Sequence, residues 1–240
     1  MLERQRSRTL AARAVPLAAR VVSAMMLLAF AACSTPPLSG TATAGLAPPA
    51  GAAHWVIDPA ASRIWLQLRA DGPLARLGHT HVIVAQQLQG HVWLHPQLER
   101  SLVEVNIPVA ALLVDDAGER ARAGGDFAEP LDDAARSGTR EHMLGDRQLD
   151  AAHYPSITLR SRALHVAGDI TTIEFQVQLK DHQSLLSVPL KWQQGGRELR
   201  ASGALVFNQT DLGLEPYSVA LGALRVADSI AARFEIVARP

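Results

Sequence analysis

The stretch LGHTHVIVAQQLQG, residues 77–90, gives the first indication of how this chain folds. Its centre is β-branched and it has glycine near both ends, which is typical of a strand. Side chains alternate along a strand, so His79, His81 and Ile83 share one face. Neither face is purely polar or purely apolar. This mixture favours a sheet closed around a partly polar interior, with the two histidines near a rim.

Alternating hydrophobic residues predict strands along most of the chain after residue 54. The sharpest alternation is at residues 172–179, where Ile173, Phe175, Val177 and Leu179 form one face and Thr, Glu and Gln the other. Further strands are predicted at residues 55–58, 63–70, 92–94, 98–108, 156–164, 184–192, 198–208 and 230–236. About eight or nine strands with short turns indicate an all-β antiparallel sandwich or up-and-down barrel. The interior is either a filled core or a cavity for one elongated apolar ligand.

Residues 115–150 interrupt this pattern and are dense in Asp, Arg, Gly and Ala. Residues 131–136 and 139–144 predict two short helices, with Ser137 or Thr139 as an N-cap. Two roles for this middle insertion stay open. It is either a lid across one mouth of the barrel or a surface insertion that covers an edge strand.

The N-terminal residues predict export. Arginines precede the apolar run of residues 21–32, which is too short for a membrane span of about 20 residues and is organised like a signal peptide at residues 1–32. Small residues before Cys33 resemble a bacterial lipobox, which predicts a lipidated Cys33 and attachment to the outer membrane. Ordinary cleavage at a nearby Ala-x-Ala-like site is the alternative. Residues 33–53 predict a flexible linker, and both alternatives place the folded part, residues 54–240, in the periplasm.

The composition argues against several classes of function and site. The 240 residues carry 23 basic and 23 acidic side chains, and this balance argues against nucleic-acid binding. The single cysteine rules out an intramolecular disulfide or a Cys-rich zinc site. No nucleophile elbow, phosphate-binding glycine loop or dinucleotide fingerprint is present, and we predict no cofactor and no enzyme activity.

Two neighbouring segments resemble the central signature of the YceI-like family: REHML at residues 140–144 and LDAAHYPSITLRS at residues 149–161. Pro155 cannot continue a helix and forces Tyr154 into an extended conformation, so the chain passes directly from helix to strand. Further matches are WVID at residues 55–58, HVIVAQQLQG at 81–90, TDLGL at 210–214 and VADSI at 226–230. The resemblance covers Trp55 to Val237, and the histidine-rich Gly78–His81 element departs from the family pattern.

The resemblance implies an extended, lipocalin-like antiparallel barrel of about eight strands with short helices in the middle insertion. It also implies a periplasmic, non-catalytic protein that holds a polyisoprenoid or another amphiphilic lipid. No catalytic residue is carried over from the family. Together with the alternation that places side chains inside the barrel, the resemblance predicts these ligand-binding residues: His79, His81, Ile83, Arg140, Tyr154, Phe175, Val177, Trp192 and Phe207.

Other interpretations stay open. His79 and His81, two residues apart on one strand, could share a metal in a hydrolytic enzyme, with His91, His142 or His153 as the third ligand. In the lipid-binding interpretation the same two histidines contact the ligand's head group or only pack. Partnership with a membrane-bound redox cytochrome is a third interpretation. The oligomeric state is open, with a homodimer as one alternative.

Overall fold

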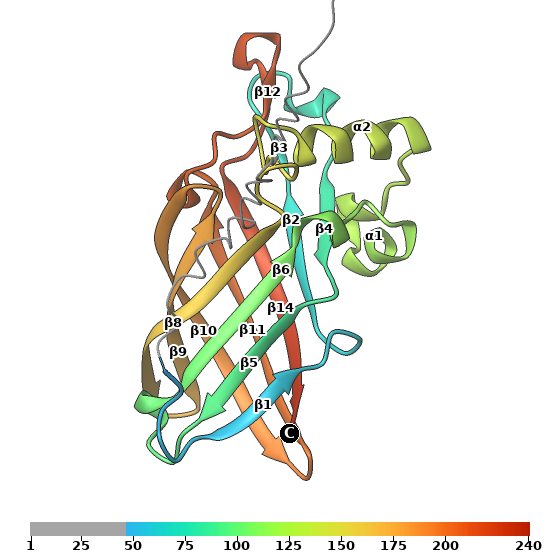
Figure 1. Ribbon diagram of the computed structural model, residues 1–240. Coiled ribbons are helices and arrows are strands. Elements are labelled where there is room, and N and C mark those ends of the chain that lie inside the picture. Colours follow the sequence, from blue (N-terminus) through green and yellow to red (C-terminus); the bar gives the residue numbers. More distant parts are fainter. Residues whose placement is uncertain (1–46) are drawn as a thin grey trace, which may run out of the picture. The chain divides into compact units, whose positions relative to one another are not determined.

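The computed structural model describes residues 47–240, which form a closed antiparallel β-barrel (Figure 1). The longer strands are β1 (Ala53–Ile57), β2 (Arg63–Leu68), β4 (His81–Ala85), β5 (Gln89–Leu94), β6 (Leu102–Pro108), β8 (Ser156–Ala167), β9 (Ile170–Leu179), β10 (His182–Gly195), β11 (Glu198–Asn208) and β14 (Ser229–Arg239). Short strands are β3 (Ala70–Asp71), β7 (Leu113–Val114), β12 (Ser218–Val219) and β13 (Leu224–Val226). The helices are α1 (Ala117–Ala123) and α2 (Asp133–Leu144).

The barrel closes because β14 pairs with β11 on one side and with β1 and β2 on the other. β1 and β2 lie one after the other along β14. In the same way, β4 pairs with β2 and β5 pairs with β1. When such consecutive pieces are counted together, the wall has eight strands. The predicted up-and-down barrel is therefore confirmed.

The single strand predicted at residues 77–90 is wrong in detail, because the chain forms two strands there, β4 and β5. The break contains Gln87, whose φ of 55° is left-handed, and Leu88, which is fully buried. Pairing with β2 begins only at His81, so His79 lies outside the strand and is exposed. The two histidines therefore do not share a strand face.

The predicted inward faces are confirmed in the described part of the chain. Ile173, Phe175, Val177 and Leu179 are all buried, whereas the residues between them are partly exposed. Two large clusters of buried side chains cover the inner wall, one centred on β4 to β6 and the other on β8 to β10. Alternation along antiparallel strands is what places these residues on one side of the wall.

The middle insertion, residues 115–150, consists of two structurally distinct halves. Its first half, α1 with the 3₁₀ turn Gly125–Ala128, covers the outer face of β4, where Phe127 packs on the buried Val82 and Val84. This explains why neither face of the histidine strand is polar. Its second half is one helix, α2, where the sequence predicts two. The α2 N-cap is Asp132, which accepts a hydrogen bond from Ala135 N at 2.7 Å, in place of the predicted Ser137 or Thr139.

The predicted signal peptide, Cys33 and the linker as far as residue 46 lie outside the described residues. Within residues 47–240, no helix is both long and apolar enough to cross a membrane.

Candidate ligand-binding site

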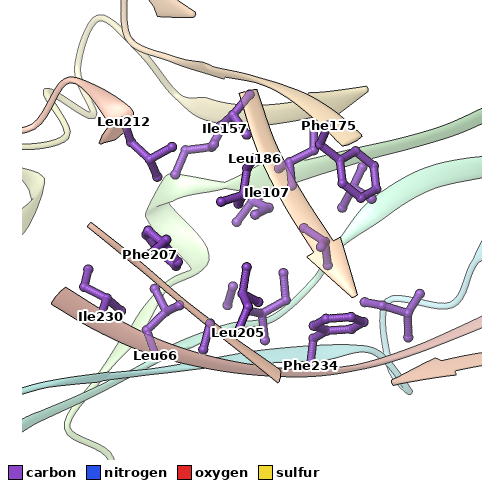
Figure 2. Close-up of a pocket in the computed structure, with 18 of the residues that line it drawn as sticks. Leu66, Ile107, Ile157, Phe175, Leu186, Leu205, Phe207, Leu212, Ile230 and Phe234 are labelled. Atoms are coloured by element: carbon purple, nitrogen blue, oxygen red, sulfur yellow. The ribbon is translucent and has the colours of Figure 1, made fainter. Parts of the chain in front are cut away.

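A cavity of about 410 Å³ runs inside the barrel and is lined almost entirely by hydrocarbon (Figure 2). This volume lies within the range of small-molecule pockets, about 300–1,000 Å³. Most strands of the wall contribute to its lining, which includes Ile57, Leu66, Ile83, Val105, Ile107, Ile157, Leu159, Phe175, Val177, Leu186, Val188, Trp192, Leu205, Phe207, Leu212, Ile230 and Phe234. The inward residues therefore surround an open space and do not fill the interior completely.

The structure places most of the predicted ligand-binding residues on this cavity. Its lining includes His81, Ile83, Phe175, Val177, Trp192 and Phe207. It does not include His79, Arg140 or Tyr154. Arg140 instead points its guanidinium at the backbone, donating to Leu112 O and Ala110 O, and so holds α2 against the turn after β6.

Polar groups gather where α2 meets the cavity. His81, Thr139, His142, Gln148 and Tyr217 all belong to the lining. The rings of His142 and Tyr217 stack with centroids 4.7 Å apart, and Gln148 Nε2 donates to Glu215 O at 3.0 Å. These contacts join α2 and the turn after it to the loop between β11 and β12. The α2 end of the cavity is thus built from segments that are far apart in sequence.

The opposite end has fewer polar groups, and these are engaged within the protein. Trp192 Nε1 donates to Thr171 Oγ1 at 3.2 Å, and Ser101 Oγ accepts from His95 N at 2.9 Å. All of these except His95 line the cavity. A ligand therefore meets mostly hydrocarbon at this end, and meets most of the polar side chains of the lining, such as Gln148 and Tyr217, at the other.

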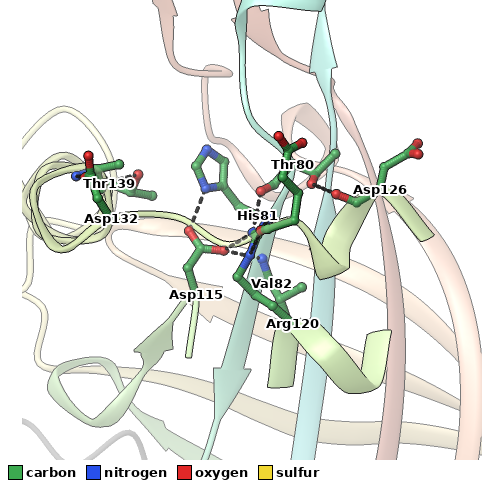
Figure 3. A network of polar contacts seen from close by, with 10 residues as sticks. Thr80, His81, Val82, Asp115, Arg120, Asp126, Asp132 and Thr139 are labelled. Atoms are coloured by element: carbon green, nitrogen blue, oxygen red, sulfur yellow. Dashed lines mark hydrogen bonds and ion pairs between the residues drawn. The ribbon is translucent and has the colours of Figure 1, made fainter. Parts of the chain in front are cut away.

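His81 is fixed from behind by a buried ionic network (Figure 3). Asp115, which is 0% exposed, contacts His81 Nδ1 at 2.6 Å through Oδ2. Its Oδ1 accepts from Arg120 Nη1 at 2.7 Å and from Val82 N at 2.8 Å. Arg120 is itself buried and donates to Thr80 O and Glu129 O as well. The loop before β4, the insertion and α1 are therefore locked together behind the cavity wall.

The charge of Asp115 sets the orientation of the imidazole. Burial by itself would raise the pKa of Asp115, but hydrogen bonds from His81, Val82 N and Arg120 outweigh it and hold the pKa below its usual value. An ionised carboxylate only accepts hydrogen bonds, so His81 Nδ1 must carry the proton that it shares with Asp115. This leaves Nε2 of His81 as the group free to meet a ligand.

The metal site of the alternative hydrolytic interpretation, built on His79 and His81, is not assembled. His79 is exposed, whereas His81 is turned toward Asp115. His142 lies across the cavity end beside Tyr217, and His153 pairs with Asp150 at 2.8 Å. Among residues 47–240, no three His, Cys, Asp or Glu side chains are arranged to hold a metal ion.

Sequence reasoning missed Thr139, Gln148 and Tyr217 as cavity residues, and it missed Asp115 and Arg120 as the support of His81. None of them stands in an alternating strand pattern. Asp115 has a left-handed φ of 51°, a conformation that Asp adopts more readily than most residues. The sequence carried no further signal of their role.

Comparison with known proteins agrees with this architecture. The fold is similar to Burkholderia cenocepacia BcnA, with a TM-score of 0.56 and 17% identity, over 75% of this chain and 98% of BcnA. The Campylobacter jejuni YCEI protein gives a TM-score of 0.42 at 10% identity, over 58% of this chain and 72% of that protein. A mutant of it for nanotechnology applications gives 0.48 at 10% identity, over 66% and 84%. No curated protein sequence matches the chain.

At these identities, the likeness to BcnA shows a shared fold. The family is shown by the sequence itself, because the YceI-like domain matches residues 55–238, which is most of the chain. This protein therefore belongs to the YceI-like domain family.

Proposed function

We propose that this protein is a non-catalytic binding protein that holds a polyisoprenoid or another amphiphilic lipid inside the barrel. The observation that carries the proposal is the asymmetry of the cavity: hydrocarbon lines nearly all of it, and most of its polar side chains, His81, Gln148 and Tyr217 among them, gather at the α2 end. The hydrocarbon chain lies among residues such as Phe175 and Val188. The head group lies beside His81, Gln148 and Tyr217.

The size of the hydrophobic effect favours a long chain. Burying one methylene gains about 0.8 kcal/mol, so ten of them gain about 8 kcal/mol, which corresponds to a Kd of about 1 μM. Loss of translational and rotational freedom on binding reduces this gain. A ligand that stays bound through purification therefore needs more than about ten buried carbons or well-placed polar contacts.

The direct test is mass spectrometry of an organic extract from the full chain expressed with export. We expect one prenyl-type or other amphiphilic lipid at close to one molecule per chain. An extract without lipid, from protein that circular dichroism shows to be folded β-sheet, would contradict the proposal.

We expect His81 to contribute to binding of the ligand's head group and not to binding of its hydrocarbon chain. We expect His81→Phe to weaken binding of a prenyl alcohol by about tenfold, because one hydrogen bond contributes about 1 kcal/mol or more. Binding of the prenyl hydrocarbon of the same length should change little. Competition against a fluorescent lipid measures both affinities.

His153→Phe is the matched control, because His153 is exposed and is not part of the cavity lining. It should bind both probes as the unmodified protein does. Equal loss of the alcohol and the hydrocarbon in His81→Phe would mean that the residue shapes the wall and does not bind a head group.

We further propose a periplasmic protein held at the outer membrane by a lipidated Cys33, on the basis of the lipobox-like residues before it. Incorporation of radiolabelled palmitate into the full chain, and its loss in Cys33→Ser, is the expected result. Export with no label in either form would support ordinary signal-peptide cleavage.

A further inference from the structure

The barrel wall is incompletely hydrogen-bonded between β10 and β11. The two strands pair from Gly195↔Glu198 to Lys191↔Ser202, and their pairing ends there. β10 nevertheless stays paired with β9 as far as His182, and β11 stays paired with β14 as far as Asn208. Residues 184–190 of β10 and 203–208 of β11 therefore face each other as two unpaired edges, called the seam below.

Two residues account for the end of this ladder. Pro189 has no N–H to donate, and proline is tolerated only where a strand is not paired on that side. Gly203 follows the last pair on β11, and a side chain there would approach Pro189 O to 2.4 Å and the Phe234 ring to 2.7 Å. Glycine thus permits the close approach at which the seam begins. The seam is a consequence of local sequence.

The seam is apolar on its inner side, and its outer side carries two exposed apolar side chains and no charge. On the inside, Leu186, Val188, Leu205 and Phe207 all line the cavity, and Figure 2 shows three of them around the same space. On the outside, Leu185 of β10 and Val206 of β11 are 70% and 67% exposed. Their exposed neighbours on these strands, Ser187 and Ala204, carry no charge. A hydrocarbon chain that passed between these two edges would therefore meet no charged side chain of residues 184–190 or 203–208.

A short cover lies over the top of the seam: the 3₁₀ turn Thr210–Leu212 with Gly213. Leu212 reaches into the cavity lining, and Gly213 abuts the His182 ring of β10. Thr210 donates two hydrogen bonds to the carboxylate of Asp228, just before β14: from its N at 2.9 Å and from its Oγ1 at 2.7 Å. In the described chain, no hydrogen bond joins the cover to β10. The cover is thus attached on the β14 side and only packs on β10.

We propose that the seam is a lateral portal through which the hydrocarbon chain of the lipid enters and leaves the barrel. This inference rests on the proposed function. A chain that passed through the α2 end would have to cross the polar groups of His81, His142 and Tyr217. Passage through the seam keeps it among apolar side chains, and the cover opens and closes the route.

The test bridges the seam chemically. Ser187→Cys with Val206→Cys is made in full-length Cys33→Ser protein and joined by a short bismaleimide. Lys191→Cys with Ser202→Cys, in the paired part of the same two strands, is the matched control. Exchange of bound lipid with vesicles that carry a fluorescent prenyl lipid is followed before and after bridging. Bridging the seam should slow exchange by about tenfold or more and leave the control rate unchanged.

Gly213→Ala tests the cover in the opposite direction, because its Cβ would meet the His182 ring at 2.5 Å and push the cover from β10. Faster exchange is expected. Unchanged rates in both the bridged and the Gly213→Ala proteins would overturn the portal. Lipid content at equilibrium separates the two proposals: a protein that never binds lipid contradicts the proposed function, whereas bound lipid with an unaffected rate contradicts the portal alone.

Discussion

Replacing Asp115 with alanine is expected to lower the free energy of unfolding by about 3–5 kcal/mol, since removal of one partner from a buried ion pair leaves the other charge unpaired. Arg120 would keep its bonds to Thr80 O and Glu129 O but lose its carboxylate. Val82 N and His81 Nδ1 would also lose their acceptor. Alanine adopts the left-handed φ of position 115 less readily than aspartate, which adds to the loss. Urea unfolding measures the change.

Asp126→Ala is the matched control, because Asp126 also pairs with an arginine but is 78% exposed. Surface pairs contribute about 0–1 kcal/mol, so this variant should unfold almost as the unmodified protein does. Asp115→Asn should fall between the two. Its amide can donate to His81 Nδ1 and move the ring proton to Nε2, which ¹⁵N NMR of the imidazole detects. A loss for Asp115→Ala no larger than for Asp126→Ala would show that the network does not stabilise the fold.

The pH dependence follows from the lowered pKa of Asp115. A carboxyl group whose pKa is lower in the folded state contributes its full stabilisation above its unfolded pKa, about 3.9. That stabilisation is lost as the pH falls from there through the folded pKa. The stability advantage of the unmodified protein over Asp115→Asn should therefore be constant near neutral pH and shrink below about pH 4. A constant difference down to pH 2 would contradict this.

The barrel could be predicted because alternation is a local signal. Residues 172–179 alternate without error, and each predicted inward residue is buried. The match around residues 149–161 placed the start of β8, which follows Pro155. The predicted direct passage from helix to strand is wrong, because α2 ends at Leu144 and turns occupy residues 145–153 before β8. The histidine stretch was predicted less well, since Gln87 interrupts it by a left-handed turn that no composition marks.

The polar end of the cavity could not be predicted from local pattern. His81, His142, Gln148 and Tyr217 come from four separate segments, and only barrel closure brings them to one cavity. Arg140 illustrates the opposite error. It belongs to the family-like signature and was predicted to meet the ligand, but its guanidinium holds backbone carbonyls. A sequence motif indicates that a residue is needed, but only its contacts in the structure show which role it has.

Phe175→Asp is expected to abolish lipid retention. Phe175 is buried on the cavity wall, and a carboxylate there would stand among Ile173, Val177 and Leu186 with no partner. A hydrocarbon chain beside it would have to displace the water that hydrates the charge, at a cost of several kcal/mol. This cost is of the same order as the gain from burying ten methylenes, about 8 kcal/mol. A lipid held at micromolar affinity should therefore dissociate during purification. Lipid per chain by mass spectrometry is the measurement.

Gln176→Asp, at the next position of β9 and outside the cavity lining, is the matched control and should retain the lipid. A buried aspartate also destabilises a wall, so a second variant blocks the cavity without charge. Ile157 packs against both core clusters and lines the cavity between them, and Ile157→Trp would fill space there while the wall stays apolar. Loss of lipid from both folded variants, with retention in Gln176→Asp, places the chain inside the barrel. Normal lipid content in folded Phe175→Asp and Ile157→Trp would mean that the lipid binds elsewhere, because neither an unpaired charge nor a filled cavity is compatible with a chain among these residues.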